Sequence, residues 1–175
     1  MGFKLKMDTF LFSFYVILFI LIVSTFLFFI INEILKSRSL DLEITKLRKK
    51  IYQEKATEKD YYNLANIYIK KDLYTQAERE FLKLLDNKNL DKSQLALIYN
   101  SLGYVYSAQE QYDLAIKYYK KALSYVPDYI LTRINLARIF EIKNLRIDAI
   151  NMYKEVLIFD PKNEFAKRKI KFLKV

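Results

Sequence analysis

A pattern of residues recurs three times between residues 58 and 163 and constrains the fold more than any other feature. Each copy has a leucine and then a small residue, an aromatic three residues later, an alanine nine residues after that, and a second aromatic four residues further on. These residues are Leu64, Ala65, Tyr68, Ala77 and Phe81; Leu102, Gly103, Tyr106, Ala115 and Tyr119; and Leu136, Ala137, Phe140, Ala149 and Tyr153. A recurrence every 34 to 38 residues predicts a stack of similar structural units.

The residue types at these positions predict pairs of closely packed helices. Small side chains let two helices approach each other, and the aromatic rings fill the space between adjacent helices. Pro127 and Pro161 each predict the end of a helix, because the residue before a proline disfavours the helical conformation. Two glycines and two prolines in 175 residues are too few for the turns of a β-rich fold. We therefore expect an all-α fold.

The pattern resembles the tetratricopeptide repeat, a unit of 34 residues that forms an antiparallel pair of helices. The third copy, from Asn135 to Asn163, is especially similar to the family pattern. In the register of this family the repeats span 58–91, 96–129 and 130–163, and residues 92–95 form an insertion in the first loop between repeats. The resemblance implies a right-handed superhelix, that is, a solenoid of three repeats.

Residues 164–175 are predicted to form a helix that caps the open end of this solenoid. Ala166, Ile170 and Leu173 fall on one helical face, and the lysines of this segment fall on the other faces. The alternative is a basic tail that binds acidic lipid or nucleic acid.

Residues 10–31 form an uncharged run of 22 residues. At about 1.5 Å per residue, a helix of this length spans roughly 33 Å, which is enough to cross a hydrocarbon core of about 30 Å. We expect one transmembrane helix that contacts the lipid bilayer, preceded by a short tail of residues 1–9. A cleaved signal peptide is the alternative, but its apolar region is shorter and ends in small residues. A buried core helix is also possible, but this run is apolar on every face.

Residues 32–57 are predicted to form a basic helical stalk or linker. Leu40, Ile44, Leu47 and Ile51 form one apolar stripe, which we expect to lie against the first repeat. The alternative is self-association of the stripe as a short coiled coil.

The charges that flank the apolar run allow two interpretations of the side of the membrane on which the repeats lie. Six basic residues between 36 and 50, against two before the apolar run, place the repeats in the cytoplasm. Long C-terminal domains, however, cross membranes largely regardless of charge. We favour the periplasmic or extracytoplasmic side, because a charged N-terminal tail that is retained inside gives an uncleaved signal anchor with the repeats outside. We expect a bacterial inner membrane, since the many Ile, Lys, Asn, Tyr and Phe residues are typical of AT-rich bacterial coding.

Composition and charge exclude several classes of function. The sequence contains no histidine and no cysteine, which excludes histidine acid–base chemistry, thiol nucleophiles and His/Cys zinc sites. It also has no glycine-rich phosphate loop. We expect no enzyme, no cofactor, no metal and no small-molecule substrate. The net charge of +10 comes from the two ends, since residues 51–161 hold 16 basic and 15 acidic residues, so we expect no nucleic-acid partner.

The resemblance implies that the first helix of each repeat lines a concave groove that binds another protein, as a peptide or a helix. The groove positions are Lys59, Tyr62, Asn66 and Lys70 in the first repeat, Asn100, Tyr104 and Ser107 in the second, and Arg138 and Glu141 in the third. Chaperone-binding members of the family carry a clamp for a chain-terminal carboxylate. Asn66 matches one clamp position, but Tyr62, Ser101 and Leu131 replace other members.

These features predict a membrane-tethered scaffold or adaptor in a bacterial envelope assembly such as secretion, motility or cell-wall machinery. The alternative is a cytoplasm-facing regulatory adaptor or co-chaperone at the membrane.

Overall fold

The computed structural model describes residues 2–87 and 89–174, and within them the chain forms eight helices and no strand. The helices are α1 (Gly2–Tyr52), α2 (Glu58–Lys70), α3 (Tyr74–Leu85), α4 (Lys92–Ala108), α5 (Tyr112–Tyr125), α6 (Ile130–Ile142), α7 (Arg146–Phe159) and α8 (Glu164–Leu173). The prediction of an all-α fold is confirmed. The chain divides into two compact units, Met1–Arg48 and Lys49–Val175.

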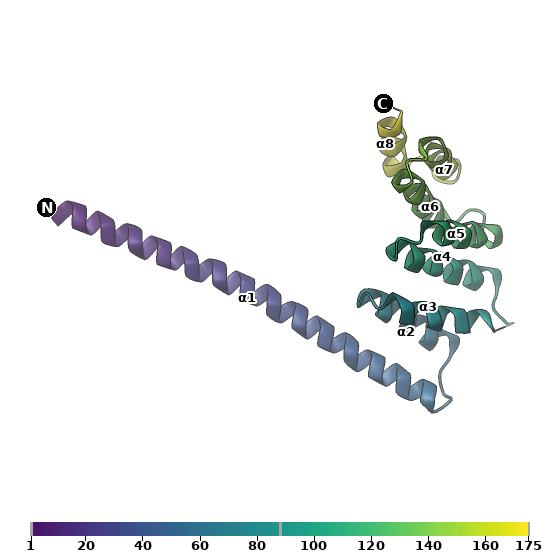
Figure 1. Ribbon diagram of the computed structural model, residues 1–175, viewed down its shortest axis with the longest axis horizontal. Helices are drawn as coiled ribbons and strands as arrows, with labels where there is room; N and C mark the ends of the chain where they lie inside the picture. Colours follow the sequence, from purple (N-terminus) through teal and green to yellow (C-terminus); the bar gives the residue numbers. More distant parts are fainter. Residues whose placement is uncertain (1, 88, 175) are drawn as a thin grey trace. The chain divides into compact units, whose positions relative to one another are not determined.

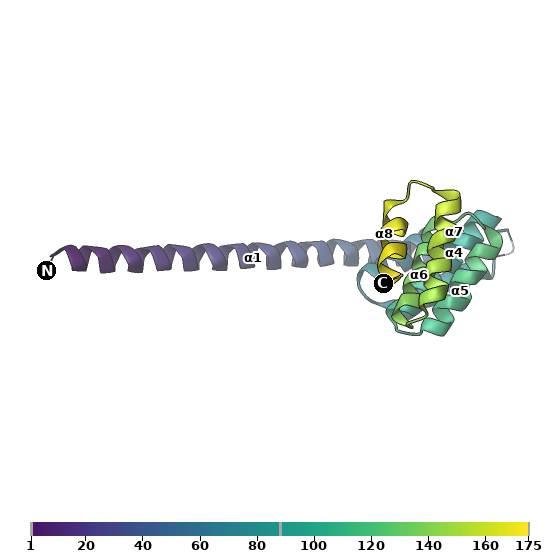
Figure 2. The same ribbon diagram turned by 90° about the horizontal axis from the view of Figure 1, so that it is seen from above.

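The first unit is most of α1, which Figures 1 and 2 show as one unbroken helix. The large apolar side chains between residues 14 and 31 are exposed, from 38% for Val23 to 71% for Phe29. The hydroxyls of Ser24 and Thr25 donate to carbonyl oxygens three residues earlier in the helix, which satisfies these polar groups internally. By length and composition, α1 is long and apolar enough to cross a membrane.

The second unit is a series of helix pairs. Helices α2 and α3, α4 and α5, and α6 and α7 pack as antiparallel pairs, as Figure 1 shows in blue-green to green. Successive pairs contact each other through α3 and α4 and through α5 and α6, and α8 packs against α7 at the end of the series. We refer to α2, α4 and α6 as the first helices and to α3, α5 and α7 as the second helices.

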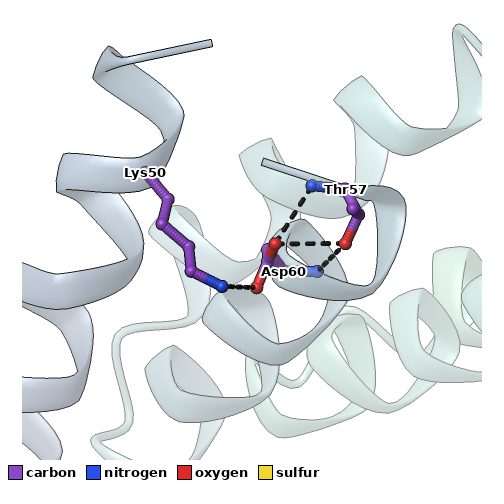
Figure 3. Close-up of polar contacts among 3 residues, drawn as sticks. All are labelled: Lys50, Thr57 and Asp60. Atoms are coloured by element: carbon purple, nitrogen blue, oxygen red, sulfur yellow. Dashed lines mark hydrogen bonds and ion pairs between the residues drawn. The ribbon is translucent and has the colours of Figure 1, made fainter. Parts of the chain in front are cut away.

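The first helix pair begins at a polar network that fixes the start of α2. The Thr57 amide donates to Asp60 Oδ2 at 3.0 Å, and the Asp60 amide donates back to Thr57 Oγ1. This reciprocal arrangement is a capping box. Lys50 Nζ donates to the other carboxylate oxygen at 3.0 Å (Figure 3). The Thr57 amide and the Lys50 ammonium both hold the pKa of the Asp60 carboxyl below its usual value.

Residues 92–95, expected as an insertion in the loop between repeats, instead form the first turn of α4. The reason is a second capping box, in which the Gln94 amide donates to Asp91 Oδ1 at 2.8 Å and the Asp91 amide donates to Gln94 Oε1 at 2.9 Å. These bonds satisfy amides that a loop conformation leaves open, so the helix starts four residues earlier than the repeat register predicts.

The leucine, small and aromatic positions of the recurring pattern are all buried in the second unit. The helices of the second pair lie close together at Gly103 on α4, which faces the buried ring of Tyr119 on α5. A Cβ atom added at Gly103 would lie 2.5 Å from Cδ1 and 2.6 Å from Cε1 of that ring. Pro127 and Pro161 are exposed, and each lies two residues beyond the last residue of the preceding helix, Tyr125 or Phe159.

We expect Gly103→Leu to lower the free energy of unfolding by about 1–3 kcal/mol, because any side chain here displaces Tyr119 from its packed position. Urea unfolding followed by circular dichroism measures the change. Ser93→Leu, at an exposed position of the same helix, is the control and should have little effect. Equal stability of the Gly103 variant and the parent chain would contradict the close approach of α4 and α5.

Candidate partner-binding groove

The predicted groove residues all lie on the first helices. Lys59, Tyr62, Asn66 and Lys70 are on α2, Asn100, Tyr104 and Ser107 are on α4, and Arg138 and Glu141 are on α6. Two pockets lie between neighbouring first helices. One is at the junction of the first and second repeats, and the other is at the junction of the second and third repeats. The junctions therefore decide which of these nine residues are available to a partner.

The pocket at the junction of the second and third repeats brings together three predicted groove residues, Tyr104, Ser107 and Arg138. Its volume is about 120 Å³. Tyr104 is 46% exposed at its rim, and the buried ring of Tyr119 and the buried Ile139 belong to its lining. The pattern predicted Tyr119 only as a core residue, because its position in the repeat does not show that part of a buried ring also borders a pocket.

The pocket at the junction of the first and second repeats is mostly apolar and has a volume of about 270 Å³. It brings together two predicted groove residues, Lys59 and Tyr62, with Leu97 and Ile98 from α4. The Tyr62 ring packs 5.6 Å from the ring of Phe81, and its hydroxyl lies 3.3 Å from Ser101 Oγ. Tyr62 is therefore held by its neighbours and offers a partner only part of its surface.

The side chain of Asn100 is buried and hydrogen-bonded rather than free in the groove. It is 8% exposed, and its Oδ1 accepts hydrogen bonds from Thr132 Oγ1 at 2.9 Å and from Asn135 Nδ2 at 3.4 Å. Both donors are on α6, so Asn100 joins the second and third repeats. Asn100 was predicted to lie on a first helix of the groove and does so, but its side chain is hydrogen-bonded to the neighbouring repeat.

Glu141 is also used within the solenoid. One carboxylate oxygen accepts a hydrogen bond from the Tyr153 hydroxyl on α7, and the other accepts one from Lys169 Nζ on α8 at 2.8 Å. Burial and the bond to Glu141 both raise the pKa of Tyr153, so its hydroxyl stays protonated as a donor. Lys169 was expected on an outer face of the capping helix, and the structure instead places it against Glu141.

The remaining residues of the first repeat differ in their availability. The Asn66 amide donates to the carbonyl of Tyr62 one turn earlier at 2.9 Å, which leaves its side-chain oxygen without a hydrogen bond in the described part of the chain. Lys59 and Lys70 are exposed. These three side chains are accessible on α2, but only Lys59 lines the apolar pocket.

We expect Asn100→Ala to lower the free energy of unfolding by about 1–3 kcal/mol, because it leaves the hydroxyl of Thr132, which is 0% exposed, without its acceptor. Thermal or urea unfolding measures the loss. Asn66→Ala is the matched control, since that amide bonds only within its own helix, and we expect a change below about 0.5 kcal/mol. Equal losses in the two variants would show that Asn100 does not join the repeats.

The comparisons with known proteins agree with this architecture. A family model described as tetratricopeptide repeat matches residues 60–128 and 94–157. The chain belongs to the tetratricopeptide repeat family. Among solved structures it resembles MamA, with a TM-score of 0.67 and 19% identity over 79% of this chain and 80% of that one. It also resembles YrrB, described as a TPR protein with an unusual peptide-binding site, with a TM-score of 0.62 and 20% identity over 81% of this chain and 71% of that one.

Similar sequences are found in eukaryotes, and two of them are informative. The chain is 75% identical to ycf37 of Cyanophora paradoxa, over 95% of this chain and 97% of that protein. It is 28% identical to the chloroplastic tetratricopeptide repeat domain-containing protein PYG7 of Arabidopsis thaliana, over 80% of this chain and 46% of that protein. Neither organism is a bacterium, so the bacterial setting expected from the composition is not confirmed.

Proposed function

We propose that the chain is a membrane-tethered adaptor that binds a peptide or helix of a partner protein along its first helices. The observation that carries this proposal is the pocket at the junction of the second and third repeats. There Tyr104 and Arg138 remain exposed, whereas Asn100 and Glu141 are used between helices. Tyrosine and arginine are the side chains that protein interfaces favour.

The peptide-binding role follows the family to which the chain belongs. YrrB, which shares this fold, is described as having a peptide-binding site, and stacked helix pairs present extended concave surfaces to such ligands. Binding rather than catalysis also fits the exposed aromatic and polar side chains of the groove. The partner segment would lie across α2, α4 and α6 and contact Tyr104 at the centre.

The proposed tether is the apolar run of α1 at residues 10–31, which would contact the lipid bilayer. The exposed apolar side chains between residues 14 and 31 support this role, because an apolar surface of this length is stable in hydrocarbon but not in water. The relative in Arabidopsis thaliana is described as chloroplastic, so we propose a chloroplast-type membrane in place of a bacterial one. There the repeats would bind a segment of a partner protein at the membrane.

We expect the full chain to stay in the membrane pellet after carbonate extraction. The double variant Leu21→Arg, Ile22→Arg should move to the soluble fraction, since each arginine at the centre of a span costs about 2.5–3.5 kcal/mol on insertion scales. The matched control is Leu42→Arg, Tyr52→Arg, which changes exposed residues outside the uncharged run and should stay in the pellet. Soluble parent protein would contradict the tether.

Photo-crosslinking in isolated membranes tests the groove. A benzophenone amino acid at Ser107, inside the pocket, should give a discrete adduct with a partner, and the same group at Ser124 on α5 should not. Adding Tyr104→Ala should reduce the Ser107 adduct about tenfold or more, since a central tyrosine typically contributes 2 kcal/mol or more at an interface. Tyr52→Ala, at a fully exposed tyrosine outside the groove, is the control. An undiminished adduct in the Tyr104 variant would contradict groove binding.

A further inference from the structure

We propose that the pocket between the second and third repeats binds a carboxylate side chain, Asp or Glu, of the partner segment, and that Arg138 is its counter-ion. This inference rests on the proposed groove function and names the chemistry of the partner at one point of that groove. The inference depends on three features of one pocket: the positive charge of Arg138, the polar residues at its edge and its apolar lining.

The two arginines of α6 differ in how their charge is neutralised. Arg133 is 8% exposed, its Nε donates to Glu155 Oε2 at 3.0 Å, and its guanidinium also donates to the carbonyl of Pro127. The guanidinium of Arg138 is exposed and has no hydrogen bond or ion pair with any group in residues 2–87 or 89–174. Arg133 therefore serves the fold, and Arg138 retains its full charge for a ligand.

The nearest candidate to neutralise Arg138 from within its own helix is Glu141, because residues three apart on a helix are neighbours. Both carboxylate oxygens of Glu141 are already used, one by the Tyr153 hydroxyl and the other by Lys169 Nζ. Lys169 comes from the capping helix α8 and compensates the charge of Glu141. Arg138 is therefore a cation in the groove, whereas the carboxylate of Glu141 binds Lys169 on the capping helix.

The other groups of the pocket suit a carboxylate on an aliphatic stem. Tyr104 and Ser107 line the pocket with Arg138, and both carry a hydroxyl group of the kind that can donate to an anion. The Tyr119 ring and Ile139 provide apolar surface for methylene groups. Burial raises the pKa of Tyr119 and the positive charge of Arg138 opposes this rise, so the charge of Arg138 reaches the lining of the pocket. The volume of about 120 Å³ has room for one side chain but not for a helix.

The source of the carboxylate is a side chain rather than a chain terminus. Of the positions that form a terminal-carboxylate clamp in chaperone-binding members of the family, Asn66 matches one, whereas others are occupied here by Tyr62, Ser101 and Leu131, none of which carries a positive charge. One arginine beside neutral hydrogen-bond donors can bind one side-chain carboxylate. The partner segment that carries this carboxylate would continue past the pocket in both directions.

The test uses the full chain in lipid nanodiscs and an array of nine-residue peptides that are amidated at the C-terminus. Each peptide contains one glutamate and is paired with a peptide that has glutamine at that position. The parent chain should bind the best glutamate peptides about tenfold more tightly than their glutamine partners, because charge-assisted hydrogen bonds are about twice as strong as neutral ones. Arg138→Gln should abolish this preference, so that the glutamate and glutamine peptides of each pair bind with equal affinity.

Two further variants separate a specific site from general charge. Arg79→Gln removes an exposed arginine of α3 and should keep the tenfold preference. Arg138→Lys keeps the charge but loses the planar fork, so it should retain part of the preference. Unchanged thermal unfolding of Arg138→Gln, expected for an exposed residue, shows that the fold is intact.

The outcomes distinguish the inference from the proposed function. If no peptide binds to the parent chain, both fail. Peptides that bind with no preference for glutamate, or with a preference that survives Arg138→Gln, overturn the carboxylate pocket and leave groove binding standing. A glutamine peptide with a free C-terminus that binds as tightly as the amidated glutamate peptide, and that depends on Arg138, would reassign the pocket to a terminal carboxylate.

Discussion

The structure of the repeats depends on one constraint, the small residue on each first helix that lets the second helix of the pair lie close to it. In the second repeat this contact leaves no room for a Cβ atom at Gly103, since the Tyr119 ring would lie 2.5 Å from it. Ala65 and Ala137 occupy the same position in the other repeats and are 0% exposed. The two helices of a pair pack against each other through one face, and their outer faces contact the next pair. A stack of such two-helix units therefore buries a continuous core.

The contacts between repeats determine which side chains remain for binding. Asn100 and Thr132 join the second and third repeats, and Tyr62 and Ser101 lie together between the first and second. These polar contacts hold the first helices in a fixed relation, so the pockets between them are preformed. A preformed pocket lowers the entropy cost of ordering side chains when a ligand binds.

Much of the fold could be predicted from the sequence, because the repeat period, the small residues and the two prolines each act through local packing. The start of α4 could not, since it depends on a reciprocal bond between Asp91 and Gln94 that the repeat register does not contain. The left-handed residues between paired helices were also not predicted. Asp72, Glu110 and Asn144 take φ of 56°, 61° and 58° without a glycine to mark them.

The groove could be predicted only at the level of the helix. Position in the repeat tells which face a side chain occupies, but not which neighbour reaches it. Asn100 meets a threonine 32 residues later, and Glu141 meets a lysine 28 residues later. The lysine is informative because it belongs to the cap rather than to a repeat. By holding Glu141, Lys169 removes the anion that would otherwise lie one turn from Arg138. The helix at the end of the solenoid therefore also affects the charge beside its last pocket, so the proposed binding of a carboxylate depends on an ion pair made by the cap.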